Sequence, residues 1–156
     1  MTRQEAAAAP DVIMGKIFLF DIEVCALIDP GSTHSFIAPN IASCLHKDPE
    51  MLNEKLVVRT PLGEFLVVQT VHKNCVIKIS NRDFPADLIV LPPLELDVIL
   101  GMDWLTRHRA LVNFYTKEVI FDLPGQIKVT FCGERQAIPS YLVSASTAFH
   151  LIKDGC

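Results

Sequence analysis

Short β-forming runs that alternate with turn residues are the feature that most restricts the fold of this chain. Such runs recur at intervals of roughly eight to twelve residues, the spacing typical of all-β barrels and sandwiches. Pro61-Leu62-Gly63 and Asn81-Arg82-Asp83 supply turn residues between successive runs. Before the C-terminal tail, helical patterns are confined to two short segments, residues 40–46 and 104–109. The sequence therefore predicts an all-β barrel or sandwich with one or two short helices.

Most of the expected strands form hairpins with their neighbours in the chain. They cover residues 13–20, 22–28, 56–60, 64–71, 75–79, 84–91, 98–100, 111–115, 118–123 and 126–132. Residues 47–53 are polar and predict a linker, Asp97 is expected to be a turn residue, and Asp103 predicts the N-cap of the second helix. In the C-terminal tail we expect a strand over residues 141–143 and a short helix over residues 147–153.

Composition excludes several functional classes. The chain has 156 residues, enough for one domain with a real core, and its net charge is −4 with Lys and Arg scattered, which argues against a nucleic-acid partner. Five cysteines form no C-x-x-C pair and are odd in number, so neither a disulfide framework nor a zinc site is expected. Pro92-Pro93 interrupts the longest apolar run, which argues against a membrane span. We expect an intracellular, cytoplasmic protein without a metal or cofactor.

An acidic residue at the end of an apolar run is the first candidate for chemistry. Cys25-Ala26-Leu27-Ile28 leads directly into Asp29, and Pro30-Gly31 then turns the chain. Burying a carboxylate costs free energy unless its site uses the charge. Gly31 permits a backbone shape closed to other residues, and Ser32 and Thr33 add hydroxyls. The eight residues from Ala26 to Thr33 alone also suit an ordinary strand-exit turn, since Asp, Pro and Gly are common in turns.

A second string decides between these readings. Asp97-Val98-Ile99-Leu100-Gly101-Met102-Asp103-Trp104-Leu105 follows the first string after about 70 residues, with a Pro/Gly-tipped hairpin between them. Together with Ala26-Leu27-Ile28-Asp29-Pro30-Gly31-Ser32-Thr33-His34-Ser35-Phe36-Ile37, it resembles the retropepsin-like aspartic protease domain of plant gypsy-type long-terminal-repeat retrotransposons. Ser32 and Ser35 lie close to His34 in the sequence, but the sequence contains no G-x-S-x-G motif, so a serine hydrolase is a poor alternative.

The resemblance implies a closed, barrel-like β domain that works as a homodimer. Asp29 would be the catalytic residue, with Pro30, Gly31, Ser32 and Thr33 forming the active-site loop. Ile99, Leu100 and Gly101 would support the site, and the hairpin tip Pro61, Leu62 and Gly63 would be the flap over an extended peptide. The expected domain covers residues 12–132, between a flexible leader (1–11) and a tail or linker to the next polyprotein segment (133–156).

The sequence is consistent with the need for two copies of the chain in one active site. The chain contains one Asp-x-Gly-Ser/Thr string, so it cannot supply two carboxylates from matching loops. Two close carboxylates share one proton, which lets one activate water while the other polarises the peptide carbonyl. The resemblance thus implies an aspartic endopeptidase that cleaves a retroelement polyprotein, with no nucleic acid or membrane bound by this domain.

Pro30 departs from the family pattern. Relatives usually have Ser or Thr directly after the catalytic Asp, where the hydroxyl and the backbone N–H lock the two loops across the dimer axis. Proline has neither group, and each lost hydrogen bond costs on the order of 1 kcal/mol. We therefore expect a weaker dimer and a slower or silent enzyme. The alternative function is a catalytically decayed retropepsin fold that serves as a dimerisation or peptide-binding module.

Overall fold

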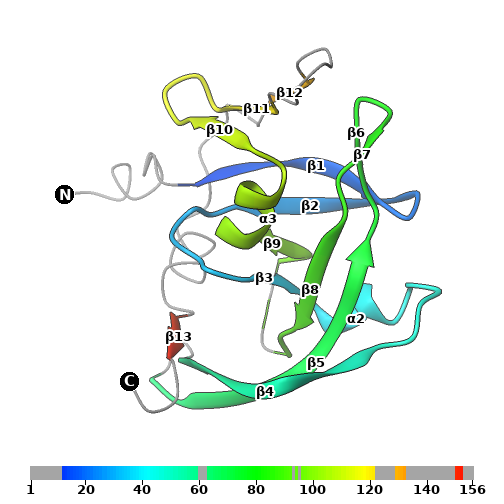
Figure 1. The fold of residues 1–156 in the computed structure, drawn as a ribbon, viewed down its shortest axis with the longest axis vertical. Coiled ribbons are helices and arrows are strands. Elements are labelled where there is room, and N and C mark those ends of the chain that lie inside the picture. Colours follow the sequence, from blue (N-terminus) through cyan, green and yellow to red (C-terminus); the bar gives the residue numbers. More distant parts are fainter. Residues whose placement is uncertain are drawn as a thin grey trace.

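The computed structural model describes residues 12–59, 63–92, 94, 96–121, 129–132 and 150–152, which form a mostly β structure with two short helices (Figure 1). The strands are β1 (Ile13–Leu19), β2 (Ile22–Ile28), β3 (Ser35–Ile37), β4 (Glu50–Arg59), β5 (Phe65–Cys75), β6 (Ile77–Ile79), β7 (Arg82–Asp83), β8 (Ala86–Val90), β9 (Val98–Leu100), β10 (Ala110–Asn113), β11 (Glu118–Phe121), β12 (Val129–Cys132) and β13 (His150–Ile152). The helices are α2 (Pro39–Ala42) and α3 (Met102–Arg107). The predicted fold class is thereby confirmed. No helix among these residues is long and apolar enough to cross a membrane.

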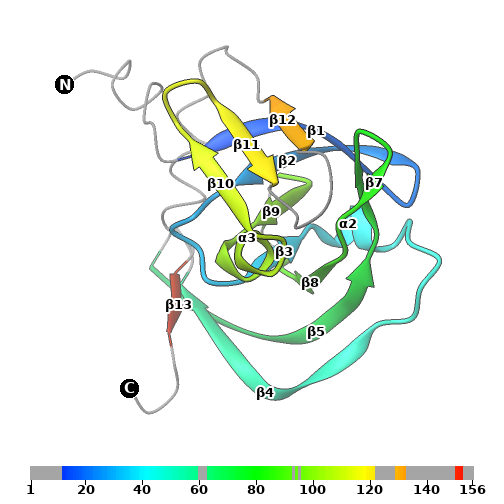
Figure 2. The same cartoon turned by 45° about the horizontal axis from the view of Figure 1, so that its top comes forward.

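Two sheets hold the described strands. The larger has ten strands in the order β13-β4-β5-β8-β3-β9-β2-β1-β6-β7, and the smaller has three in the order β10-β11-β12. Their hydrogen bonds include no pair between the outer strands β13 and β7, so the pairing of the described strands does not itself close a barrel. The long β4–β5 hairpin nevertheless curves around one side of the molecule (Figure 2).

The first hairpin forms where its pattern predicts it. Ile13, Ile17 and Leu19 are buried on one side of β1, whereas Lys16 and Phe18 are exposed on the other. This alternation is typical of a strand that covers a core with one face. β1 pairs antiparallel with β2, and the two residues between them have positive φ angles, 49° for Phe20 and 69° for Asp21. Positive φ at both central residues gives the tight turn whose twist matches a hairpin.

Three expected elements are wrong in extent or pairing. Residues 47–53 are not only a linker, because β4 begins at Glu50, which pairs with Val71. The strand is largely exposed at this end, so the segment has no regular apolar pattern from which a strand could be predicted. The hairpin expected between residues 75–79 and 84–91 is present, since Cys75 pairs with Ala86 and the Phe84 N–H donates to the Ile77 carbonyl. Its turn is shorter than expected: it lies at Ser80 and Asn81, because Arg82–Asp83 already forms β7, paired with β6. The first helix is shorter than predicted and consists of four residues.

The C-terminal tail also differs from its prediction. His150–Ile152 forms the strand β13, antiparallel to β4, so the helix expected over residues 147–153 is wrong. The strand expected over residues 141–143 lies outside the described residues, as do the leader 1–11 and most of the tail 133–156.

The core divides into two hydrophobic clusters on opposite faces of the central strands. In β2, Ala26 and Ile28 belong to one cluster and Leu27 to the other; in β9, Leu100 and Ile99 divide in the same way. All five of these residues of β2 and β9, together with Val98, are at most 1% exposed. Strands buried on both faces read as continuous apolar runs and are held rigidly.

Aromatic side chains of and near α3 pack together in the hydrophobic cluster that contains Ala26 and Ile28. The Trp104 ring lies edge-on to Phe84 and Phe121, and its Nε1 donates a hydrogen bond of 3.0 Å to the Phe84 carbonyl. His108 packs against the rings of Phe84 and Trp104, with its Nε2 only 2.7 Å from the Pro85 carbonyl oxygen. A carbonyl only accepts, so Nε2 carries the proton. Burial, which disfavours the imidazolium, lowers the pKa of His108.

Candidate active site

Asp29 lies directly after β2 and is held by backbone groups on both sides. Asp29 is only 4% exposed, and its backbone N–H donates a hydrogen bond of 2.9 Å to the Leu100 carbonyl. Its carboxylate oxygen Oδ1 accepts the Gly31 N–H at 2.9 Å, and its carbonyl accepts the Ser32 N–H at 3.0 Å. The loop therefore fixes one carboxylate oxygen against its own backbone and leaves Asp29 at the end of a rigid strand.

The start of α3 crosses the Asp29 loop at very close range. The Met102 N–H donates to the Ser32 carbonyl at 2.7 Å, and the Asp103 N–H donates to the Thr33 carbonyl at 3.3 Å. A Cβ atom on Gly101 would collide with the backbone carbonyls of His34 and Ser32. Only glycine fits at this crossing, where two backbones touch.

Ser35 and Asp103 tie the crossing together, a role that the sequence did not reveal. The Ser35 hydroxyl donates to Asp103 Oδ1 at 2.7 Å and accepts the Gly101 N–H at 3.0 Å, although Ser35 is fully buried. Asp103 is not the N-cap of α3: that position is Gly101, and Asp103 lies in the first turn, where Oδ1 also accepts the Trp104 N–H at 2.7 Å. The two residues are 68 positions apart, so no local pattern could pair them.

Asp97 makes a similar long-range bond, where the sequence predicted a turn residue. Its Oδ2 accepts the Cys25 N–H at 2.8 Å, and its carbonyl accepts the Ala38 N–H at 3.0 Å. It therefore connects the start of β9 to β2 and to the end of β3. The two carboxylates that flank β9, Asp97 and Asp103, thus support the strands around Asp29.

The remaining loop residues have distinct partners. The Ser32 hydroxyl donates to the His34 carbonyl at 2.7 Å, within the loop. The exposed Thr33 hydroxyl lies 2.9 Å from Nδ1 of His34. His34 also lines a hollow of about 430 Å³ together with Leu52, Asn53, Glu54 and Leu56 of β4. The Asp29 loop and the β4–β5 hairpin therefore border a common space.

Part of the predicted flap lies outside the described residues. Pro61 and Leu62 lie outside them, whereas Gly63 is described: it is exposed and has a φ of +89° between β4 and β5. That angle favours glycine and suits a hairpin tip. Next to the tip, the β5 side chains of Phe65 and Val67 are 61% and 58% exposed to solvent.

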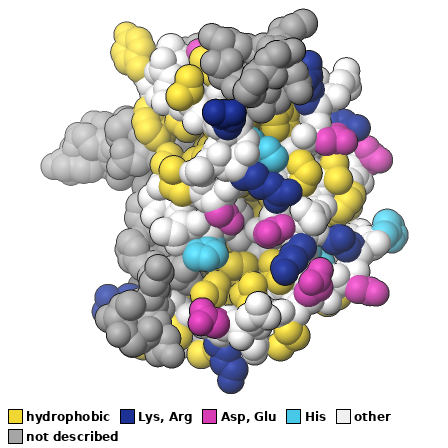
Figure 3. All heavy atoms as spheres, viewed as in Figure 1, with side chains coloured by type: hydrophobic (Ala, Val, Ile, Leu, Met, Phe, Trp, Pro, Cys, Tyr) yellow, Lys and Arg dark blue, Asp and Glu magenta, His cyan; other side chains and the backbone are white. Residues whose placement is uncertain are grey.

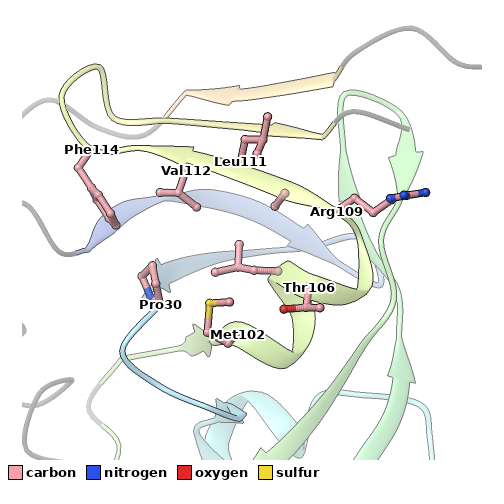
Figure 4. Close-up of a pocket in the computed structure, with 9 residues that line it drawn as sticks. Pro30, Met102, Thr106, Arg109, Leu111, Val112 and Phe114 are labelled. Carbon is pink, nitrogen blue, oxygen red and sulfur yellow. The ribbon is translucent and has the colours of Figure 1, made fainter. Parts of the chain in front are cut away.

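Pro30 opens onto a second, mainly apolar hollow of about 430 Å³ (Figure 4). Met102 and Leu105 of α3 form one wall, and Leu111 and Phe114, in and just after β10, form the other. Met102 is 40% exposed and Leu111 is 60% exposed. An apolar hollow directly beside a buried carboxylate is therefore open to solvent in a single chain.

Charged side chains elsewhere are mixed in sign. Lys, Arg, Asp and Glu are interspersed over the described part of the face shown in Figure 3. Within the described residues, no group of three or more His, Cys, Asp or Glu side chains is placed to hold a metal ion. Asp29 and its loop are thus the best-defined candidate for chemistry in this part of the chain.

Comparison with known families is consistent with this geometry. The sequence profile of the family described as "Retroviral aspartyl protease" matches residues 1–126, most of the chain. The chain belongs to the retroviral aspartyl protease family. The retropepsin-like fold expected from the two sequence strings is accordingly present.

Two relatives of this retroviral aspartyl protease domain are informative. The curated protein "DNA damage-inducible protein 1" of Yarrowia lipolytica is 29% identical over 114 residues, which are 72% of this chain and 28% of that protein. The chain thus corresponds to little more than a quarter of this relative. A crystal structure of the retroviral protease-like domain of Ddi1 from Leishmania major superimposes with a TM-score of 0.54 and 17% identity, over 76% of this chain and 89% of that one. At that identity the superposition demonstrates a shared fold only.

Proposed function

We propose that this domain is an aspartic endopeptidase that acts as a homodimer, with Asp29 from each copy forming the catalytic pair. The observation that carries the proposal is the position of Asp29: buried, fixed at the end of β2 by the Leu100 carbonyl, and bonded through one oxygen to Gly31. Membership of the aspartyl protease family supports the same chemistry. The sequence contains a single Asp-x-Gly-Ser/Thr string, so the second carboxylate has to come from another copy.

In this mechanism the two Asp29 side chains share one proton. Two carboxylates a few ångströms apart cannot both be ionised, so the pair titrates as a unit. The ionised member takes a proton from a water molecule, which attacks the peptide carbonyl. The protonated member hydrogen-bonds to that carbonyl oxygen and later a proton passes to the leaving amine. The rigid backing of the loop by β9 and α3 would keep each carboxylate in place throughout.

The apolar hollow beside Pro30 is the surface on which the second copy would dock. Pro30 is adjacent to the carboxylate that must meet its twin, so residues around Pro30 have to lie near the two-fold axis. Exposed Met102 and Leu111 provide apolar area that a second copy would cover. Pro30 itself cannot donate a backbone hydrogen bond to the other loop, and we expect a dimer weaker than one with Ser at this position.

The substrate would be an extended, largely apolar peptide held between the Asp29 loop and the β4–β5 hairpin. The hollow bordered by His34 and Leu52–Leu56 opens between these two elements and supports this placement. Strings 26–37 and 97–105, by their resemblance, favour a retroelement polyprotein as the natural substrate. Pro30 is the observation that favours the second candidate, a catalytically decayed module that dimerises or binds peptides.

Cleavage of a peptide library at mildly acidic pH tests the proposal. We expect the wild-type chain to cut extended apolar peptides, and Asp29→Asn to cut none. Asp83→Asn is the matched control, because Asp83 is a surface carboxylate paired with Lys78 at 3.4 Å and away from the Asp29 loop. Equal cutting by wild type and Asp29→Asn would refute the catalytic role. Absence of cutting by all three, with a dimer in sedimentation, would favour the decayed module.

A further inference from the structure

The edge of the predicted flap hairpin is already occupied by this chain. His150–Ile152 pairs antiparallel with β4, in the register His150 to Arg59, Leu151 to Val58 and Ile152 to Val57. These partners are the last three residues of β4, directly before the hairpin tip.

Without β13, this part of β4 would be a free edge. β13 is the outermost strand of the larger sheet, and β4 is next to it, with β5 on the opposite side. A free edge presents unpaired N–H and C=O groups, which readily add an extended peptide as a further strand. The β4 edge is therefore a peptide-binding edge by its backbone chemistry, and residues 150–152 use it.

The position of β13 relative to Asp29 gives this edge its significance. In both cartoon views, β13 lies on the side of the β4–β5 hairpin that faces the β2–β3 connection, which carries Asp29 (Figures 1 and 2). The neighbouring hollow between His34 and Leu52–Leu56 is bordered by the same two elements. The sequence around β13, Ala148-Phe149-His150-Leu151-Ile152, is mostly apolar, as expected for a peptide held in such a cleft.

We propose that residues 150–152 act as an internal occupant of the substrate-binding edge, so that an extended peptide binds to β4 only after β13 has left. This inference rests on the proposed function, because it assumes that substrate adds to the flap hairpin as a strand. The two can nevertheless fail separately, since occupancy of an edge is measurable without catalysis.

Tethering makes the internal strand a strong competitor. A segment that belongs to the same chain as its site can have an effective concentration on the order of millimolar. A free peptide of equal intrinsic affinity at micromolar concentration would therefore rarely displace it. Releasing β13 should strengthen binding of a free peptide by about tenfold or more.

Proline substitutions in the full-length chain test this proposal. Leu151→Pro and Ile152→Pro each remove one N–H, and because N–H groups alternate in direction along a strand, one of the two substitutions removes a group aimed at β4. Ser144→Pro, outside β13, is the matched control. All variants carry Asp29→Asn so that no peptide is cut, and circular dichroism checks that each remains folded.

Two readouts apply to each variant. The first is hydrogen exchange at the amides of Val57, Val58 and Arg59, and the second is the affinity for a fluorescent peptide copying residues 147–153. We expect at least one of the two β13 variants to exchange faster at these amides and to bind the peptide about tenfold more tightly than the Ser144→Pro control.

Unchanged exchange and affinity in both β13 variants would overturn the inference, as would faster exchange without tighter peptide binding. Either result would leave the catalytic proposal standing, because that proposal is decided by cleavage with Asp29 intact. Conversely, tighter peptide binding in the β13 variants, together with no cleavage by the wild-type chain with Asp29 intact, would support the internal occupant and refute the protease.

Discussion

Removing the Ser35 hydroxyl tests whether one buried side chain holds the crossing of α3 over the Asp29 loop. Ser35→Ala deletes a single oxygen from a residue with no solvent exposure. That oxygen makes two hydrogen bonds, one donated to Asp103 Oδ1 at 2.7 Å and one accepted from the Gly101 N–H at 3.0 Å. The substitution adds no atom and therefore causes no clash.

The two bonds contribute unequally to the expected loss. The Gly101 N–H is buried and would be left without its acceptor, which costs about 1–3 kcal/mol. Asp103 is exposed and keeps the Trp104 N–H, so water can replace the lost hydroxyl and the net cost there is about 1 kcal/mol. We expect Ser35→Ala to lower the free energy of unfolding by about 2–4 kcal/mol.

Urea unfolding at one fixed protein concentration measures this loss, since association of copies would otherwise shift the midpoint. Ser43→Ala is the control: its hydroxyl donates to the Asn40 carbonyl at 2.8 Å, but the bond is exposed, and we expect a change within about 0.5 kcal/mol. If Ser35→Ala destabilises no more than Ser43→Ala, the crossing does not depend on Ser35 and the reasoning is wrong.

Four further predictions concern other parts of the domain. Gly101→Ala should destabilise by more than about 3 kcal/mol in urea unfolding, because its Cβ would lie 2.5 Å from the Ser32 carbonyl oxygen and backbone cannot yield as a side chain can; a loss under 1 kcal/mol would contradict this. Pro30→Ser should tighten the dimer in sedimentation, and an unchanged dissociation constant would refute the lock argument. Burial raises the pKa of the Cys75 thiol to about 11, so iodoacetamide should label exposed Cys44 far faster than Cys75, and equal rates would show Cys75 to be accessible. Burial lowers the pKa of His108, so as the pH falls below about 6.5 the unfolded chain takes up a proton at this residue before the folded chain does, and the free energy of unfolding should decline. His108→Gln should reduce that decline, measured by urea midpoints. An identical decline in the variant would assign it to other groups.

The sequence predicted those parts of the site that depend on local chemistry. A run of apolar residues ending in Asp29 predicted both the strand and the buried carboxylate. The short apolar run 98–100 predicted a strand, which the structure buries on both faces. Gly101 was expected to support the site, and the close backbone crossing gives the physical reason for a glycine there.

Other features depend on partners that are distant in the chain. The bond from Ser35 to Asp103 and the bond from Cys25 to Asp97 span 68 and 72 positions, so local patterns assigned these carboxylates to a cap and a turn. The start of β4 is polar because it is exposed, and only its pairing with β5 identifies it as a strand. β13 likewise takes its conformation from the β4 edge, which overrides a weak helical pattern.

The insertion of β9 between β2 and β3 has a consequence for biosynthesis. β9 pairs parallel with β2 and antiparallel with β3, and the Leu100 carbonyl receives the Asp29 N–H. A nascent polypeptide that ends before residue 100 therefore lacks the strand that shapes the acidic loop. Contacts of such high sequence separation form late and slowly. A ribosome must release about 70 residues beyond Asp29 before the Leu100 carbonyl is available, so the Asp29 loop cannot take its described form while the residues before β9 are being translated.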